Sequence, residues 1–354
     1  MCVHFHNFAN MTGGGNSVKL SVSKRSLPII GPATGFLVFP LRDPDSAVKG
    51  LKGAARTFVE AELAIARCEF KRGMELTERL IRDERYVFAA VRIGIISAIG
   101  LGDLKAFDCF LKALADRGKR NTGPVIKCAV AITEAWLRQF LWISDGYPEW
   151  MDRFDLTDVP APWRPAVAYL GVKIRLCRGQ FESAYATASL FLNFICPQHG
   201  ISAACSYAKF ALAIACRETD RTGEMLNWLD EMIRALAPHG FLLPLLLFMH
   251  GMHKSPVETL LAELAPDQVQ RYRALAKGFF ANLIRARNHY TGERTTEELS
   301  FREFYLAMLL KRGWAYKELA DRFTISIGRM RNIVSILYEK LHIHSRSELK
   351  DLVW

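Results

Sequence analysis

A short run of basic and polar side chains near the C-terminus has the composition that contact with nucleic acid requires. Over residues 327–341, a helix of 100° per residue puts Arg329, Arg331, Asn332 and Ser335 on or beside one outward face. Arginine can hydrogen-bond guanine, and asparagine can pair with adenine, at base edges in the major groove. We therefore expect this face to contact double-stranded DNA. The apolar residues expected on the opposite, core-facing stripe are Ile327, Met330, Ile333, Val334, Leu337 and Leu341.

Two shorter helical segments precede this helix and must position its face. Ser300 and Glu303 have the spacing of a capping box at the start of the first segment, which is expected to end at Gly313. The second helix is expected over 316–323, followed by a turn at 324–326. A polar helical face alone is typical of a solvated surface, but two short helices and a tight turn before it favour a helix-turn-helix. The apolar residues expected to be buried in the two segments are Leu306, Leu309, Leu310, Tyr316, Leu319, Ala320 and Phe323.

The other candidate sites lack the spacing that their chemistry requires. A glycine-rich stretch at residues 13–21 superficially resembles a phosphate-binding loop, but Val18 stands before Lys19, where such a loop needs glycine. No acid, base and nucleophile stand at a catalytic spacing, so we expect no enzymatic activity and no cofactor. We also expect no metal site, because two groups lack the ligands to complete one: Cys2, His4 and His6, and His250 with His253.

The composition indicates a globular protein with an attraction for polyanions. The chain carries 47 Lys and Arg against 36 Asp and Glu, a formal charge of +11, and half of its residues are hydrophobic. Its eight cysteines form no CxxC pair, so we expect buried free thiols in a reducing cytoplasm. No apolar run approaches the ~20 residues that cross a bilayer, and the N-terminus lacks the pattern of a secretory signal. We therefore expect a cytoplasmic protein without membrane association.

Helical periodicity dominates the region between the N-terminal segment and the C-terminal unit. Residues 1–50 are rich in glycine and proline and are expected to form an irregular tail or cap. Residues 51–290 show apolar residues at helical spacing almost throughout, with no long alternation of period two. The polar, glycine-containing residues 291–298 are the natural linker to a C-terminal domain at 299–354. The expected fold class is all-α.

A weak repeat runs through the helical region. Gly102, Gly179 and Gly223 each stand before a bulky apolar residue two positions on and another helix-compatible residue three beyond. The pattern around Gly179 matches the turn of a tetratricopeptide repeat, in which a small residue lets two helices approach closely. One degenerate repeat is expected around residues 128–140. We therefore expect a tetratricopeptide-like array of helical hairpins, with an irregular helical bundle as the alternative.

The proline-rich segment at residues 144–165 interrupts this array. It contains Trp150 and Trp163 and is too broken for a long helix, so a long loop or a pair of short helices is expected. Aromatic loops of this kind are candidate surfaces for a ligand or a partner.

The C-terminal unit resembles the LuxR-type helix-turn-helix of bacterial transcription regulators. Its marks run in register along the whole unit, which makes the resemblance more specific than any short motif. They are Leu299, Ser300, Arg302, Glu303, Gly313, Lys317, Glu318, Ala320, Arg322, Ile325, Ser326, Arg331, Asn332, Lys340, Leu341, Ser345, Arg346, Glu348 and Leu349.

The resemblance implies roles for further residues. Lys317 is expected to contact backbone phosphate, and Ser326 to lie at the DNA beside the residues of the third helix. A fourth helix is expected over 345–353, where such domains pair. The dimerisation residues implied there are Ser345, Glu348, Leu349 and Leu352.

A weaker resemblance extends upstream, because a tetratricopeptide-like array before such a domain is similar to the C-terminal part of MalT-type regulators. Their ATPase has no counterpart here, since no phosphate-binding loop is present. We therefore expect a bacterial transcription regulator that binds DNA as a homodimer, controlled by a small molecule or protein sensed by the array. The alternative is an interaction adaptor whose C-terminal domain serves for dimerisation or docking.

Overall fold

The described part of the chain is entirely helical. The protein was studied as a computed structural model that describes residues 43–120, 123–194, 203–247, 256–292, 299 and 301–349. Every regular element in these ranges is an α-helix or a short 3-10 helix, which confirms the expected all-α class. None of the described helices combines the length and the hydropathy that crossing a membrane requires.

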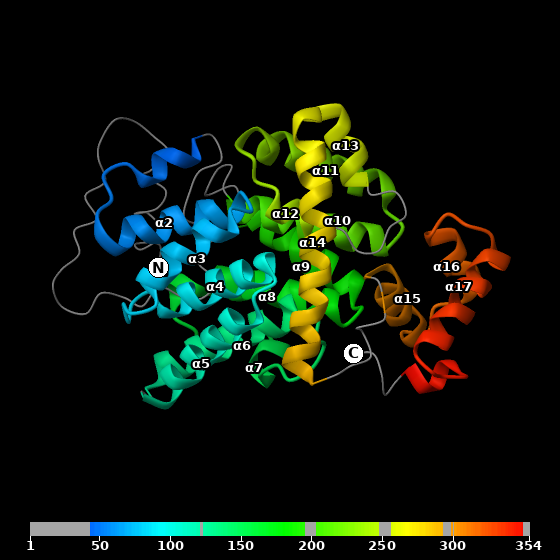
Figure 1. Ribbon diagram of the computed structural model, residues 1–354, viewed down its shortest axis with the longest axis horizontal. Coiled ribbons are helices and arrows are strands. Elements are labelled where there is room, and N and C mark those ends of the chain that lie inside the picture. The colour runs from blue at the N-terminus through cyan, green and yellow to red at the C-terminus, as the bar shows by residue number, and fades with distance from the viewer. Residues whose placement is uncertain are drawn as a thin grey trace.

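Consecutive helices of the N-terminal part pack as hairpins (Figure 1). Four hairpins share one turn geometry. A residue with positive φ follows the first helix, and the N–H of the next residue donates to the carbonyl five residues before it. In the second hairpin, for example, the Asp103 N–H donates to Ala98 O at 2.9 Å. The helix pairs are α2 (Gly53–Ala66) with α3 (Phe70–Leu80), α4 (Val87–Leu101) with α5 (Leu104–Arg120), α8 (Arg164–Cys177) with α9 (Phe181–Phe194), and α10 (Ala203–Glu218) with α11 (Thr222–Leu236).

The turn residues only partly follow the predicted repeat. Gly102 and Gly179 hold the left-handed position, with φ of 71° and 73°. The prediction for Gly223 was wrong, because Asp220 takes this position with φ of 59° and Gly223 lies in the first turn of α11. Aspartate tolerates a left-handed conformation better than most residues, so the turn needs no glycine. The tetratricopeptide type of the array stays a prediction.

The hairpins are joined and covered by single helices. Residues 128–140 belong to α6 (Pro124–Phe140), which packs against α4, α5 and α8. The segment at 144–165 forms the expected two short helices, α7 (Glu149–Asp152) and the 3-10 helix η3 (Ala161–Trp163), and Trp163 is buried in the core. The long helix α14 runs beside the array (Figure 1). The remaining elements here are η2 (Pro44–Val48), η5 (Ala237–His239), α12 (Leu243–Leu246), α13 (Pro256–Leu264) and α14 (Pro266–Thr291).

Buried apolar side chains form two separate clusters. The larger cluster extends from Ala47 to Ala286 and fills the array. The smaller one belongs to the C-terminal unit and is built by α15 (Phe301–Lys311), α16 (Tyr316–Arg322) and α17 (Ile327–Lys340) with the residues that follow. Trp142, at the end of α6, packs against this second cluster. The domain boundaries predicted at 51–290, 291–298 and 299–354 stay a prediction, and residues 293–298 lie outside the described residues.

The structure describes some of the cysteines and part of the N-terminal segment. Cys68 and Cys216 are buried thiols, but Cys109 is exposed, because it lies on the outer side of α5, so the expectation of burial was wrong there. In the described part of the chain, no group of histidine, cysteine or carboxylate side chains could hold a metal ion. Of residues 1–50, the part from Asp43 onward forms η2, whose Ala47 is buried. Outside the described residues lie the earlier part of that segment and Cys2, His4, His6, Cys196, His250 and His253.

Candidate nucleic-acid interface

The C-terminal unit holds two short helices around a tight turn. The N–H of Ala315 donates to Glu318 Oε2 at 2.6 Å, which satisfies a backbone amide at the start of α16. At its end, Thr324 adopts a φ of 53°, and the Ile325 N–H bonds Ala320 O at 3.0 Å. Ser326 then caps α17 by accepting the Arg329 N–H at 3.2 Å. The chain thus reverses between α16 and α17 at the predicted residues 324–326.

The buried face of this unit follows the predicted periodicity with two exceptions. Met330 and Leu337 of α17 are fully buried, and Leu319 of α16 packs in the same cluster. Tyr316 and Ile327 were expected to be buried, but 38% and 40% of their surface is exposed. Each is the first residue of its helix, so no preceding turn of that helix covers it. The other residues predicted to be buried in this unit are Leu306, Leu309, Leu310, Ala320, Phe323, Val334 and Leu341, which are buried, and Ile333, which is half-buried.

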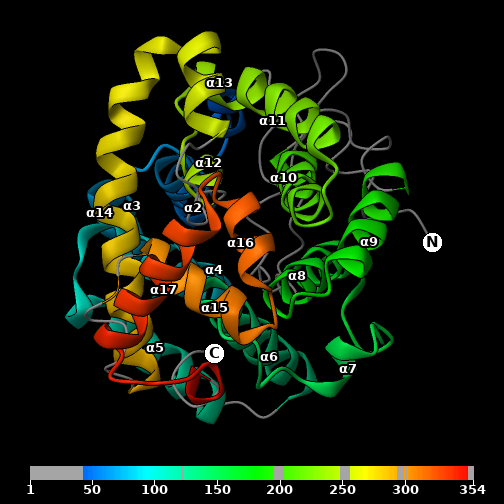
Figure 2. The same ribbon diagram turned by 90° about the vertical axis from the view of Figure 1, so that its right-hand side faces the viewer.

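The residues predicted to contact DNA are all exposed on the helix-turn-helix part of the unit. All of them are solvent-exposed, and they come from α16, the turn and the first three turns of α17. Figure 2 shows α16 and α17 in front of the array, on the side of the molecule facing the viewer. We call this surface the α17 face; its residues are Lys317, Ser326, Arg329, Arg331, Asn332 and Ser335.

The cations of the α17 face differ from the other arginines of the unit in their partners. Within the described ranges, Lys317, Arg329 and Arg331 form no ion pair and no side-chain hydrogen bond. By contrast, Arg346 Nε donates to Leu310 O at 2.5 Å, and Arg322 bonds to Glu218 and Tyr305. Unpaired cations at an exposed helix attract phosphate and can donate to base edges, so these three side chains are free to bind an anionic partner.

The predicted dimerisation residues bond within the unit. The Ser345 hydroxyl donates to Glu348 Oε1 at 2.6 Å, and this hydrogen bond lowers the pKa of Glu348. Leu349 is fully buried in the C-terminal cluster. Where a fourth helix was expected, the structure describes the 3-10 helix η6 (Arg346–Glu348), and Leu352 lies outside the described residues. The role of these residues in pairing stays a prediction.

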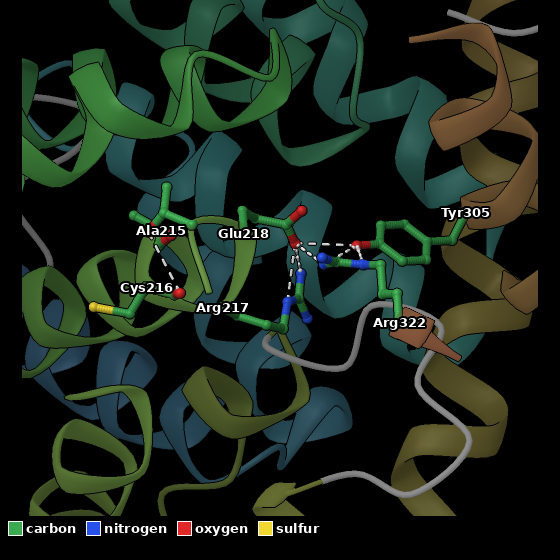
Figure 3. A network of polar contacts seen from close by, with 7 residues as sticks. Ala215, Cys216, Arg217, Glu218, Tyr305 and Arg322 are labelled. Carbon is green, nitrogen blue, oxygen red and sulfur yellow. Dashed lines mark hydrogen bonds and ion pairs between the residues drawn. The ribbon is translucent and has the colours of Figure 1, made fainter. Parts of the chain in front are cut away.

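A buried polar contact that was not predicted from the sequence joins the unit to the array. Figure 3 shows Glu218, at the end of α10, accepting hydrogen bonds from both units. Its Oε1 accepts the Tyr305 hydroxyl at 3.0 Å, Arg217 Nε at 2.9 Å, and Arg322 Nη2. Arg322 Nε in turn donates to the Tyr305 hydroxyl at 3.1 Å. We call these four residues the docking network: Arg217, Glu218, Tyr305 and Arg322.

The docking network is held in its charged form despite its burial. The side chains of Glu218 and Arg322 are 3% and 10% exposed. Burial alone raises the pKa of Glu218, but the positive charges of Arg217 and Arg322 outweigh that effect and hold the pKa below its ordinary value. Arg322 was recognised from the sequence only as a mark of the C-terminal unit. Its partner is 104 residues away in the chain, and no periodic signal links the two.

Two more arginines support this contact. Arg312, which directly follows α15, donates to the carbonyl of Cys177 at the end of α8. The guanidinium of Arg287, on α14, lies over the ring of Phe304 at 5.1 Å. The C-terminal unit therefore contacts the array through charge-assisted and cation–π interactions, and the α17 face takes no part in them.

In comparisons with known proteins, no family model, no curated protein and no solved structure matches the chain.

Proposed function

We propose that this protein is a bacterial transcription regulator of the LuxR type, which binds double-stranded DNA through the α17 face. The observation that carries the proposal is the set of unpaired cations, Arg329, Arg331 and Lys317, on an exposed helix-turn-helix. By contrast, three other arginines of the unit, Arg312, Arg322 and Arg346, have intramolecular partners. The exposed Asn332 adds a side chain that can pair with adenine. The sequence marks of the C-terminal unit supply the family.

The residues of the α17 face divide by the contact expected of them. Arg329, Arg331 and Asn332 lie in the first two turns of α17, so they are the residues proposed to reach base edges in the major groove. Lys317 lies on α16 and is proposed to contact phosphate. Ser326 caps α17, which fixes the end of the helix that approaches the DNA.

One recognition helix reads few base pairs, so we propose that the regulator binds as a homodimer on two half-sites. In this proposal the array of α2–α14 receives a small-molecule or protein signal. The docking network is the described polar contact through which a change in the array would reach the C-terminal unit.

Selection from a random pool of DNA duplexes tests the proposal. The purified protein should enrich a motif at moderate salt, and Arg331→Ala should lose that motif while keeping its helix content. Arg79→Ala is the matched control, because Arg79 is an exposed arginine on α3, far from the unit in the chain. Lys317→Ala should weaken binding to all sequences about equally and reduce the salt dependence of the affinity.

Failure to enrich any motif, or equal enrichment by the native protein and Arg331→Ala, would contradict the proposal. In that case the protein would be better described as an interaction adaptor whose C-terminal unit serves for docking.

A further inference from the structure

A cavity of about 40 Å³ lies inside the array, where α4, α6, α8, α10, α12 and α14 meet. Its walls are mostly apolar and include the rings of Trp136 and Phe140. The cavity also carries polar side chains, among them Lys173 and Gln139. No side chain lining it is acidic. The cavity therefore combines a mostly apolar wall with basic and polar side chains.

Lys173 and Gln139 are buried polar side chains without intramolecular partners for their end groups. They are 9% and 7% exposed. Within the described part of the chain, no hydrogen bond or ion pair joins the Lys173 amine to another residue. The backbone carbonyl of Gln139 accepts from Cys177 Sγ at 3.7 Å, but its side-chain amide bonds no described residue. Buried polar groups are nearly always satisfied, so these two need partners inside the cavity, supplied by water or by a ligand.

The electrostatics around Lys173 favour one negative charge. Arg92, the other basic residue on the wall, already forms a buried ion pair with Glu62. Burial lowers the pKa of Lys173. The nearby Cys177 acts in the opposite direction, and the positive charge of Arg217 lowers the pKa further. A bound anion would offset both, because an opposite charge in contact favours the protonated amine. A single anionic group thus matches Lys173, the one lysine on the cavity wall, which has no counter-ion among the described residues.

The size and the walls of the cavity restrict what carries that charge. Its 40 Å³ corresponds to roughly three water-sized positions, which suits a ligand of only a few heavy atoms. The wall is mostly aliphatic and aromatic, which suits a ligand with a carbon chain, and sulfate and phosphate have none. We propose that this cavity binds a small carboxylate of about two to four carbons, with its oxygens at Lys173 and Gln139 and its tail against Trp136 and Phe140.

The cavity is also connected to the C-terminal unit. Trp142 lines the cavity and packs against the apolar cluster of α15–α17. Its backbone has a φ of 63°, so its position is set by the turn at the end of α6. A ligand in the cavity would contact a side chain that supports the C-terminal unit. That consequence rests on the proposed function, whereas carboxylate binding itself does not.

Titration of the full-length protein with propionate, without DNA, tests the proposal. Trp136 and Trp142 line the cavity, so occupancy should change the intrinsic tryptophan fluorescence, and calorimetry gives an independent affinity. A ligand of five heavy atoms binds with at best micromolar affinity, so the titration runs from micromolar to millimolar concentrations. Propionamide, of the same shape but neutral, and sulfate, an inorganic anion, are the matched probes.

The lysine variants identify the site. Lys173→Met should weaken propionate binding about tenfold or more, because it removes a charge-assisted hydrogen bond and keeps the volume of the side chain. It should also raise the midpoint of thermal unfolding, which shows that the variant is folded, and Lys173→Gln provides a second uncharged variant. Lys127→Met, at an exposed position of α6, should bind propionate like the native protein.

Saturable binding of propionate but not propionamide, lost in Lys173→Met and kept in Lys127→Met, supports the proposal. It is overturned if propionate does not bind, if propionamide binds equally well, if sulfate competes as strongly as another carboxylate, or if Lys173→Met binds like the native protein. Because no DNA is present, these results do not depend on whether the protein enriches a DNA motif.

Discussion

Replacing Glu218 by glutamine should release the C-terminal unit from the array. The carboxylate accepts hydrogen bonds from Arg217, Tyr305 and Arg322, and its side chain is only 3% exposed. Glutamine keeps the shape but removes the negative charge, which leaves two buried guanidinium groups without their counter-ion. Removing one partner of a buried ion pair costs about 3–5 kcal/mol. Moving Arg322 into water avoids part of that cost, so undocking is the expected response.

Hydrogen exchange measures this response segment by segment. Because about 3 kcal/mol corresponds to roughly a hundredfold change in an opening equilibrium, protection in α15 and α16 should fall by up to that factor in Glu218→Gln. Glu182→Gln is the matched control, since Glu182 pairs with Arg221 on the surface of the array, where its side chain is 70% exposed. The control should leave exchange in α15 and α16 unchanged. Equal effects of the two variants would refute the view that Glu218 holds the unit in place.

The same carboxylate sets a pH dependence whose sign follows from its pKa. In the folded protein the pKa of Glu218 lies below the ordinary 4.5, because the attraction of Arg217 and Arg322 outweighs burial. A lowered folded pKa contributes stability that is present above the unfolded pKa and is lost as the pH falls through the folded value. The native protein should therefore undock progressively below about pH 4.5, whereas docking in Glu218→Gln should lack this component.

Three further substitutions test the local structure by thermal or chemical denaturation. Gly328→Ala should stabilise α17 by about 0.5–1 kcal/mol, because no atom lies within 4 Å of the added Cβ; a loss of stability would mean that the glycine conformation is needed. Ser326→Ala should destabilise the unit by about 0.5–2 kcal/mol through loss of the cap on the Arg329 N–H, and Ser347→Ala, at an exposed position of η6, is its control. Gly94→Ala should cost about 1–3 kcal/mol, because the new Cβ would overlap the ring of Phe110, whereas Gly223→Ala, with open space around it, should not.

Sequence periodicity predicted the C-terminal unit well because its signals are local. The ends of α16 and α17 fall within a residue of the expected positions, since the turn at 324–326 and the apolar spacing lie within one short stretch. Periodicity failed at Tyr316 and Ile327, because a helical wheel assigns a direction but not the extent of the neighbour that covers it. Periodicity also predicted a glycine turn at Gly223. In the structure Asp220 takes the left-handed position of the turn between α10 and α11.

The docking network and the cavity could not be predicted from the sequence for a different reason. In the sequence, Glu218 and Lys173 each lie in a helical pattern, where nothing distinguishes them from polar residues on the surface of a helix. Only the tertiary packing buries them and decides whether a partner is present. Glu218 meets Arg322 across 104 residues, whereas Lys173 meets no counter-ion among the described residues. No single-sequence pattern encodes either outcome, because both depend on helices that are far apart in the chain.

The position of Glu218 on its helix explains why its carboxylate needs hydrogen-bond donors from the C-terminal unit. Glu218 is the last residue of α10, where the helix dipole disfavours a negative charge. A buried carboxylate at such a position needs cations, and the array supplies Arg217 while the C-terminal unit supplies Arg322 and the Tyr305 hydroxyl. When the unit leaves, the carboxylate loses two of these three partners but gains water. Docking and release are therefore closer in free energy than a purely apolar interface would make them, which suits the proposed function, in which a signal in the array shifts docking.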